Sequence, residues 1–269
     1  MSMREHIREL WAARELLRAL VRRDLRVRYR GSYFGFAISI LVPIVQVAVL
    51  TVVFKRMTRF SSIENYSAHL FCGTLPWSFI YLTSVESCNC ILKNRDIVKK
   101  VYFPREVLPL SVMLGNLIHL GFTMLLFLLY LFVVVRPPVL WTLVWLPVIF
   151  FFFAALALGL SFLFSVANTL LRDVEYLLSF AFTLGFFVTP ILYPAGVVKQ
   201  NLAEPYFTIY MLNPVAVAIE QTRFAILGAG DFPPPTSAQL AAGAATCVLA
   251  LAAGYAVFRR LQWRLPELV

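Results

Sequence analysis

Charged residues are scarce in this chain. Only 14% of its 269 residues are Asp, Glu, Lys or Arg, whereas about a quarter are charged in an average soluble domain. At the same time, 60% of the residues are hydrophobic. A soluble fold of this length cannot bury so much apolar surface. The composition therefore excludes a soluble globular protein and predicts that lipid surrounds most of the chain.

Acidic residues are the scarcer of the two charge types. The chain has 24 Lys and Arg against 14 Asp and Glu, which gives a formal net charge of +10. In a soluble protein this excess would suggest nucleic-acid binding. Here the basic residues lie between long apolar runs, so orientation in a membrane explains them better. We expect membrane lipids, and no nucleic acid, as partners.

Residues that carry catalysis or bind metals are also few. Cys88 and Cys90 lack the paired spacing of a zinc site, and all four cysteines lie in or beside apolar runs. The three histidines are scattered, and no Ser/His/Asp set, carboxylate pair or G-x-x-x-x-G-K-[ST] phosphate loop stands out. We expect no metal, no disulfide and no catalytic site. Any uphill transport must then take its energy from another chain.

Long apolar segments are what the chain has in abundance. A helix needs about 20 mostly apolar residues to cross a bilayer. Six segments meet this length with few or no charges, at residues 31–54, 65–85, 107–135, 137–171, 176–198 and 232–258. The sequence therefore predicts an all-α integral membrane protein, with one domain of six transmembrane helices over residues 31–269.

One apolar region, residues 205–230, is too interrupted to be a seventh span. Asn213-Pro214 divides it into two pieces that are each too short to cross. Asn suits a helix N-cap, and Pro suits the first helical position. Glu220 and Arg223 are three residues apart and can pair on one helical face. We predict two short re-entrant helices that enter the outer membrane face and return, packed on protein.

The distribution of basic residues predicts the orientation, because an even number of spans places both termini on one side. That side holds nine arginines in residues 1–30, five Lys or Arg in residues 93–105, Arg172, and three arginines in the C-terminal tail. The other side holds six Lys or Arg. The positive-inside rule therefore places both termini in the cytoplasm.

The N-terminal segment, residues 1–30, has an amphipathic pattern. Apolar residues recur at helical spacing from Ile7 to Val21, and arginines occupy the other faces. This pattern predicts an interface helix along the cytoplasmic membrane surface, with its arginines facing lipid phosphates. The helix could be a plain anchor or could contact a cytoplasmic partner.

A compact charged segment, residues 93–105, separates two of the spans. It contains no Gly or Ser and interleaves apolar residues such as Val98 with its charges. Pro104 is expected to end its helical piece, since the residue before a proline disfavours helical angles. One interpretation is a solvated loop that only fixes orientation. The other, which we favour, is a short amphipathic helix that docks in a groove on another protein.

Several motifs resemble those of the membrane subunits of type-2 ABC exporters, in particular exporters of O-antigen, teichoic acid and capsule-like polysaccharides. The motifs are LVRRDLRVRYRGSYFGF (20–36), GTLPWSFI (73–80), VYFPREVLPLS (101–111), RDVEYLLSF (172–180), TPILYP (189–194) and LNPVAVAIEQTRFAILG (212–228). The resemblance covers nearly the whole chain, with the motifs in the expected order.

This resemblance implies partners and a substrate. Two copies of the permease would pair, and each would bind a separate ATPase subunit that holds ATP and Mg, while this chain binds no cofactor. Residues 94–103 would form the coupling helix seated in a cleft of the ATPase, and the two re-entrant helices would cap the outer mouth. The substrate would be a polysaccharide on undecaprenyl diphosphate, exported across the bacterial cytoplasmic (inner) membrane.

Three sets of candidate site residues follow from this reading. The surface that couples to the ATPase comprises Asn94, Arg95, Asp96, Val98, Val101, Tyr102, Phe103 and Arg105. The lipid diphosphate needs cations near the cytoplasmic surface, and the candidates are Arg26, Arg28 and Arg30. A long wet polymer needs a continuous aromatic or polar path, for which the candidates are Trp77, Tyr81, Phe182, Phe186, Tyr193 and the carboxylate of Glu86.

Two alternative functions remain open at this stage. A type-2 exporter of a small amphiphile, such as a drug or a simple lipid, would have the same fold. The aromatic content and the Phe-Pro-Arg-Glu segment argue against it. A passive channel or scaffold that needs no ATPase would leave the surface of residues 98–103 without a purpose.

Overall fold

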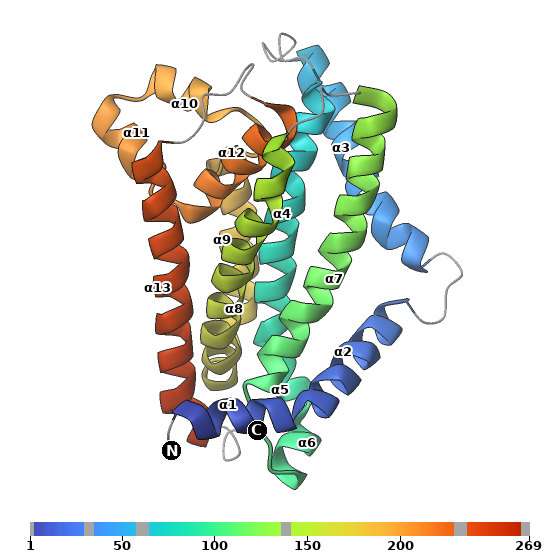
Figure 1. Ribbon diagram of the computed structural model, residues 1–269, viewed down its shortest axis with the longest axis vertical. Coiled ribbons are helices and arrows are strands. Elements are labelled where there is room, and N and C mark those ends of the chain that lie inside the picture. Colours follow the sequence, from blue (N-terminus) through green and yellow to red (C-terminus); the bar gives the residue numbers. More distant parts are fainter. Residues whose placement is uncertain (1–2, 30–34, 58–64, 136–140, 229–235, 265–269) are drawn as a thin grey trace.

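The computed structural model describes residues 3–29, 35–57, 65–135, 141–228 and 236–264. Within these ranges every regular element is a helix, and no strand occurs. Figure 1 shows long helices that run between two ends of the molecule, with shorter helices gathered at each end. The predicted all-α class is confirmed.

The long helices form the body of the molecule. They are α3 (Gly35–Met57), α4 (Tyr66–Cys88), α7 (Val107–Tyr130), α8 (Leu146–Leu170) and α13 (Ser237–Leu261). A π-helical turn, Leu131–Val135, continues α7, and a 3-10 turn, Trp141–Trp145, precedes α8.

Three helical stretches are long and apolar enough to cross a membrane. They are Val107–Val135, Thr142–Leu170 and Ser237–Arg264. Leu41–Phe54 and Val174–Val188 are shorter apolar helices. The structure thus supports an integral membrane protein, while the count of six spans stays a prediction.

Helix α4 is the centre of the bundle. It contacts α8, α7, α12 and α3, and most of its residues are buried, including the polar His69, Thr74 and Thr83. Because other helices rather than lipid surround α4, it can carry polar side chains that a lipid-facing helix could not.

Helices α8 and α13 touch backbone to backbone at two glycines. A Cβ atom on Gly159 would lie 2.5 Å from the carbonyl oxygen of Ala250, and a Cβ on Gly254 would collide with the carbonyl oxygen of Gly159. Small residues permit this close approach between membrane helices, where dispersion contacts drive association.

The fifth span was predicted at residues 176–198, but the helix ends earlier, so the predicted C-terminal boundary is wrong. Helix α9 comprises Val174–Val188, only 15 residues. Thr189 has extended backbone angles, with ψ at 145°, as expected for a residue that precedes a proline. Residues 189–194, named here the outer segment, then lead away from the helix.

Three short helices follow the outer segment: α10 (Ala195–Asn201), α11 (Glu204–Tyr210) and α12 (Pro214–Leu227). The two helices predicted for residues 205–230 are α11 and α12, whereas α10 lies where the fifth span was expected to end. The three helices lie together at one end of the bundle (Figure 1). The predicted helix start is confirmed, because the side chain of Asn213 accepts a hydrogen bond from the N–H of Val215 at 3.0 Å. Helix α12 packs against α4, α8 and α13, as expected of a helix supported by protein.

The opposite end of the bundle, named here the basic end, holds four short elements. They are α1 (Met3–Ala12), α2 (Arg14–Tyr29), α5 (Cys90–Lys93) and α6 (Arg95–Lys100). The single predicted N-terminal helix is therefore two helices. Its amphipathic pattern is confirmed, because Leu17 and Leu20 pack on a core that includes Val98 and Phe258.

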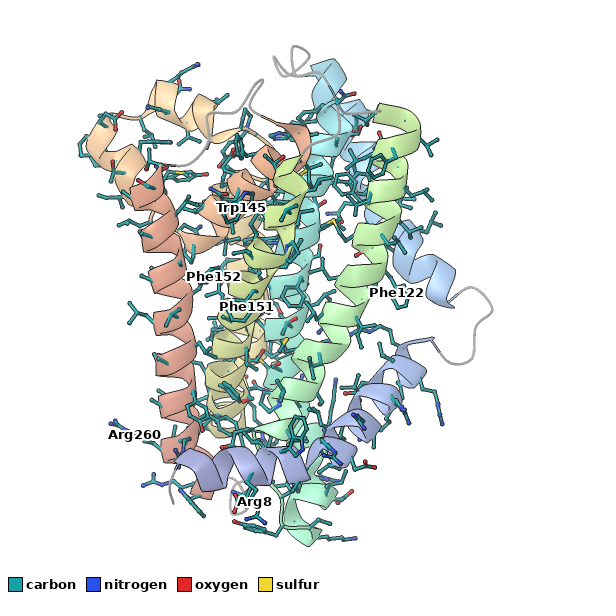
Figure 2. The ribbon with its side chains drawn as sticks, viewed as in Figure 1. Arg8, Phe122, Trp145, Phe151, Phe152 and Arg260 are labelled. Carbon is teal, nitrogen blue, oxygen red and sulfur yellow. The ribbon has the colours of Figure 1, made fainter. Side chains whose placement is uncertain are left out.

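Charged and apolar surfaces are separated along the length of the bundle. The last turn of α13 reaches the basic end (Figure 1). Figure 2 shows Arg8 and Arg260 there, while Phe122 and Phe151, farther along the bundle, are exposed. This arrangement suits a molecule whose sides face lipid and whose ends face water.

Candidate transport path and docking surface

Aromatic residues from two helices line a hollow of about 450 Å³ on one side of the bundle, named here the aromatic groove. Trp77 and Tyr81 project from α4, and Phe182 and Phe186 from α9. The rest of the lining comes from α3, α7 and further positions of α4 and α9: Val42, Pro43, Gln46, Ser78, Leu82, His119, Thr183 and Phe187. The structure therefore gathers four of the six residues predicted for the path.

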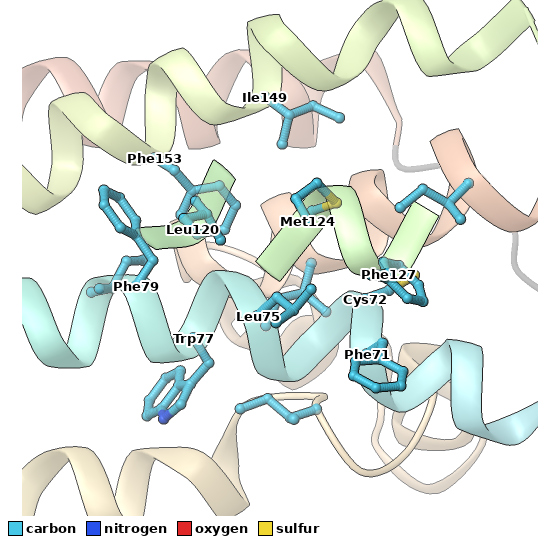
Figure 3. Packing of buried hydrophobic residues seen from close by; sticks show 14 of the residues in the cluster. Phe71, Cys72, Leu75, Trp77, Phe79, Leu120, Met124, Phe127, Ile149 and Phe153 are labelled. Atoms are coloured by element: carbon cyan, nitrogen blue, oxygen red, sulfur yellow. The ribbon is translucent and has the colours of Figure 1, made fainter. Parts of the chain in front are cut away.

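The rings in the groove meet edge to face. Trp77 lies 5.5 Å from Phe182 and 6.2 Å from Phe186 between ring centroids, and Tyr81 lies 5.7 Å from Phe182. Such tilted pairs are favoured by the ring quadrupoles. Figure 3 shows Trp77 on the side of α4 away from Leu120.

A glycine on α9 makes room for the indole ring. A Cβ atom on Gly185 would lie 2.9 Å from Cη2 of Trp77, closer than real Cβ contacts. The edge-to-face packing of Trp77 against α9 therefore depends on a residue without a side chain at this position. Gly185 was not recognised from the sequence, because nothing in its local pattern marks it.

The remaining two path candidates lie outside the groove. Tyr193 belongs to the outer segment, and its hydroxyl lies 2.9 Å from the carbonyl oxygens of both Phe187 and Val188. Glu86 lies lower on α4, toward the basic end, where it contacts Arg28. These two residues were predicted for the path from their residue type and their expected depth in the membrane. Neither property specifies which face of a helix the side chain occupies.

Arg28, Glu86 and Asn116 form a polar network between three helices. One terminal nitrogen of Arg28 on α2 lies 2.7 Å from both carboxylate oxygens of Glu86 on α4. The other terminal nitrogen donates to the side chain of Asn116 on α7 at 2.8 Å, and Asn116 in turn donates to Glu86 at 2.9 Å. This closed set of charge-assisted bonds ties α2 to the bundle.

A hollow of about 480 Å³, named here the basic hollow, lies beside this network. Its lining includes the cations Arg23, Arg28 and Lys93 and the carboxylates Asp24 and Glu86. Arg23 pairs with Asp24 at 2.9 Å and donates to Asn94 at 2.7 Å. Of the other cations predicted to meet a diphosphate, Arg26 is exposed on α2 and Arg30 lies outside the described residues. Arg23 and Lys93 were not among the predicted cations, although both belong to the basic segments of the sequence.

The predicted coupling helix is shorter than expected. Helix α6 has six residues, Arg95–Lys100, rather than the whole of 94–103. Val101 already has extended angles (φ −127°, ψ 133°), and Pro104 lies four residues beyond the helix end. The proline therefore does not end this helix, because the chain has already become extended at a β-branched valine.

The eight predicted docking residues divide into an exposed set and a supporting set. The exposed set, named here the docking tip, comprises Arg95, Asp96, Val101 and Tyr102. The supporting residues Val98 and Phe103 are buried in the core beneath it, Asn94 is also buried, and half-buried Arg105 donates to the carbonyl oxygen of Gln262.

Tyr102 is the most exposed aromatic residue of the docking tip, with 83% of its surface accessible, and Val101 beside it is 55% exposed. These two apolar side chains are displayed together on a buried base, and their docking on another protein stays a prediction. Among the described residues, no cluster of His, Cys, Asp and Glu could hold a metal ion.

Comparison with known proteins identifies the class. Residues 15–227 match the family described as ABC-2 type transporter. The chain is 33% identical over 209 residues to an O-antigen export system permease protein RfbA of Myxococcus xanthus, covering 78% of this chain and 79% of the relative. It is 30% identical over 258 residues to an O-antigen export system permease protein RfbA of Klebsiella pneumoniae, covering 95% of both. The chain belongs to the ABC-2 type transporter family, whose members are membrane subunits of transporters.

The matched region contains the features described above. It begins in α2 and ends with the last residue of α12. The aromatic groove, the basic hollow and the docking tip all lie within it.

Proposed function

We propose that this chain is the transmembrane subunit of an ABC exporter that moves a polysaccharide linked to undecaprenyl diphosphate, of O-antigen, teichoic acid or capsule type, across the bacterial inner membrane. The proposal is supported by relatives named as O-antigen export permeases, one of which aligns along 95% of both chains. The structural observation that carries it is the aromatic groove.

The groove has the chemistry that a sliding sugar polymer requires. Its walls of Trp77, Tyr81, Phe182 and Phe186 offer ring surface that can stack on the CH faces of sugars without fixing one orientation. Gln46, Ser78, His119 and Thr183 add hydrogen-bonding groups to the lining, which successive sugars can meet in turn. A tight pocket would bind one unit and stop a polymer from moving.

The groove suggests that two copies of the chain act together. Helix α9 buries only Leu178 fully, while Tyr176, Phe180 and Phe187 are exposed. A second copy packed against this face would cover these side chains and close the open side of the groove. A homodimer with the path near its centre is therefore part of the proposal.

The docking tip is proposed to contact the ATPase on the cytoplasmic side. The family pairs with ABC ATPases, and the partner would bind ATP and Mg, because this chain has no phosphate loop. Eighteen of the 24 Lys and Arg residues lie on the side assigned to the basic end, and the positive-inside rule makes that end cytoplasmic.

The basic hollow is the proposed place for the lipid diphosphate. Arg28 is already paired with Glu86, so we assign it a structural role in the resting state. Lys93, which lines the hollow, and the exposed Arg26 can supply the cationic contacts that a diphosphate needs. Arg23 also lines the hollow but pairs with Asp24 at 2.9 Å, so it would have to exchange that partner for the diphosphate.

Deleting the gene in its source bacterium tests this function. We expect undecaprenyl-linked glycan to accumulate on the inner leaflet, because synthesis continues while export stops. The measurement is chemical analysis of the lipid-linked intermediate and of the surface glycan. Normal surface glycan after deletion would contradict the proposal, and accumulation of a small amphiphile instead would identify the alternative exporter.

A further inference from the structure

Arg223 on α12 is fully buried although it carries a charge. Its Nη1 atom lies 2.6 Å from the carboxylate of Glu220, which is itself 5% exposed. Its Nη2 atom donates to the carbonyl oxygen of Ile191 at 2.8 Å. Gly73 on α4 makes this possible, because a Cβ atom there would lie 3.2 Å from both Nη2 and the backbone of Ile191. The ion pair of Glu220 and Arg223, predicted from local spacing, therefore also binds the backbone of the outer segment through Arg223.

Two further bonds hold the same stretch of backbone. The hydroxyl of Tyr66 on α4 donates to the carbonyl oxygen of Leu192 at 2.7 Å. The carboxylate of Glu220 accepts the N–H of Ala195 at 3.1 Å. Side chains from α4 and α12 thus bind the backbone on both sides of Tyr193 within the outer segment and at the start of α10.

Stability alone does not explain a buried ion pair at this position. Desolvating two charges can cost more than their attraction returns, and apolar replacements of similar volume are often neutral or stabilising. What the charges add is direction, since a planar guanidinium aims donors at carbonyl groups that extended backbone leaves unpaired. A buried charged group in a membrane protein is a reason to look for a function.

The outer segment in turn holds the end of α9. The hydroxyl of Tyr193 lies 2.9 Å from the carbonyl oxygens of Phe187 and Val188 in the last turn of that helix. Phe182 and Phe186 on the same helix form one wall of the aromatic groove. Fixing the outer segment therefore fixes where this wall ends.

We infer that Arg223 and Glu220 are positioning residues that lock the outer segment and the end of α9 onto α4. The two aromatic walls of the groove then keep their spacing while a substrate passes. This inference deepens the proposed function and depends on it for the transport measurement. It also implies that Thr189-Pro190 is not a hinge during transport. Helix α4, the outer segment and α12 would then move together as one rigid body.

The test compares the single variant Arg223→Met with the double variant Glu220→Met/Arg223→Met in the permease–ATPase complex. The single variant leaves the buried carboxylate of Glu220 without its cationic partner, so its Tm should fall. The double variant removes both charges, so its Tm should be higher than that of the single variant. It should stay below that of the wild type, because the carbonyl of Ile191 and the N–H of Ala195 lose their partners. Transport of the lipid-linked glycan should nevertheless fall about tenfold in the double variant, because the loss of a charge-assisted bond frees the outer segment.

Cysteine labelling reports on the outer segment directly. Leu192→Cys replaces a residue that is 5% exposed, so a maleimide should label it slowly in the otherwise unchanged chain. In the double variant the labelling rate should rise about tenfold, in line with the bonds lost. Lys199→Cys on the exposed surface of α10 is the control reporter and should react equally in both backgrounds. Gln221→Met, on the same helix as the pair, is the control substitution.

If the double variant transported glycan at the wild-type rate and Leu192→Cys were still labelled slowly in it, the positioning role of Arg223 and Glu220 would be contradicted. Lost transport with unchanged labelling would overturn it too, since the outer segment would then not have moved. If the wild-type complex did not transport the lipid-linked glycan, the proposed function would be contradicted instead. The labelling comparison would still decide the lock in that case, because it needs no substrate.

Discussion

Single residues decide how the aromatic groove is built. The sequence could indicate Trp77 and Phe182 as path candidates, because aromatic residues in spans form a short list. It could not indicate Gly185, whose role depends on the indole ring that lies over it. Nor could it pair Arg28 with Glu86, since these residues are 58 positions apart and each has a plausible separate role.

Gly185→Ala should impair transport through the groove. The added Cβ would lie 2.9 Å from Cη2 of Trp77, so the indole must move, and we expect transport to fall roughly tenfold, the scale of a modest overpacking cost. The measurement is glycan export by the reconstituted complex. Gly121→Ala on α7 is the matched control, because no atom lies within 4 Å of a Cβ there. Equal export by both variants would show that the position of Trp77 is unimportant.

Tyr102→Ala should weaken binding of the ATPase. Exposed tyrosines at the centre of an interface often contribute 2 kcal/mol or more, so affinity should fall about thirtyfold. Co-purification from detergent and titration of the isolated subunits measure this change. Tyr206→Ala is the control, because Tyr206 is 64% exposed at the opposite end of the molecule. Undiminished affinity for Tyr102→Ala would remove the docking tip from the interface.

Whole elements follow local signals where those signals act on the backbone. The Asn213-Pro214 start of α12 is present as predicted, because the cap and the proline act within one turn. Helices α6 and α9 both end earlier than predicted, for different reasons. Helix α6 ends before its proline, while α9 ends where Thr189-Pro190 demands, although the apolar run continues to residue 198.

Gly254→Ala should loosen the contact between α8 and α13. The new Cβ would collide with the carbonyl oxygen of Gly159, so the two helices must separate, and overpacking of this kind costs about 1–3 kcal/mol. We expect a lower Tm in detergent. Gly115→Ala on α7 has no atom within 4 Å of its Cβ and should leave the Tm unchanged. An unaltered Tm in Gly254→Ala would mean that this contact does not hold α13.

The proposed orientation of the molecule across the membrane can be tested by labelling in intact cells. A maleimide that cannot cross membranes should label Tyr206→Cys from outside, and should label Tyr102→Cys only after the cells are opened. The native cysteines give little background because all four are buried, and burial raises the pKa of the Cys90 thiol, which leaves less reactive thiolate. Labelling of Tyr102→Cys from outside intact cells would show that the proposed orientation is wrong.

The sequence by itself determined the class of this protein, its amphipathic N-terminal segment, the Asn213 cap and the pairing of Glu220 with Arg223. Each of these depends on composition or on residues within one or two helical turns, so spacing along the chain is enough. Tertiary structure alone decided the aromatic groove, the network of Arg28, Glu86 and Asn116, and the bonds that hold the outer segment. Between helices in lipid, contacts depend on which faces pack together, and hydrophobicity alone does not distinguish one apolar face from another.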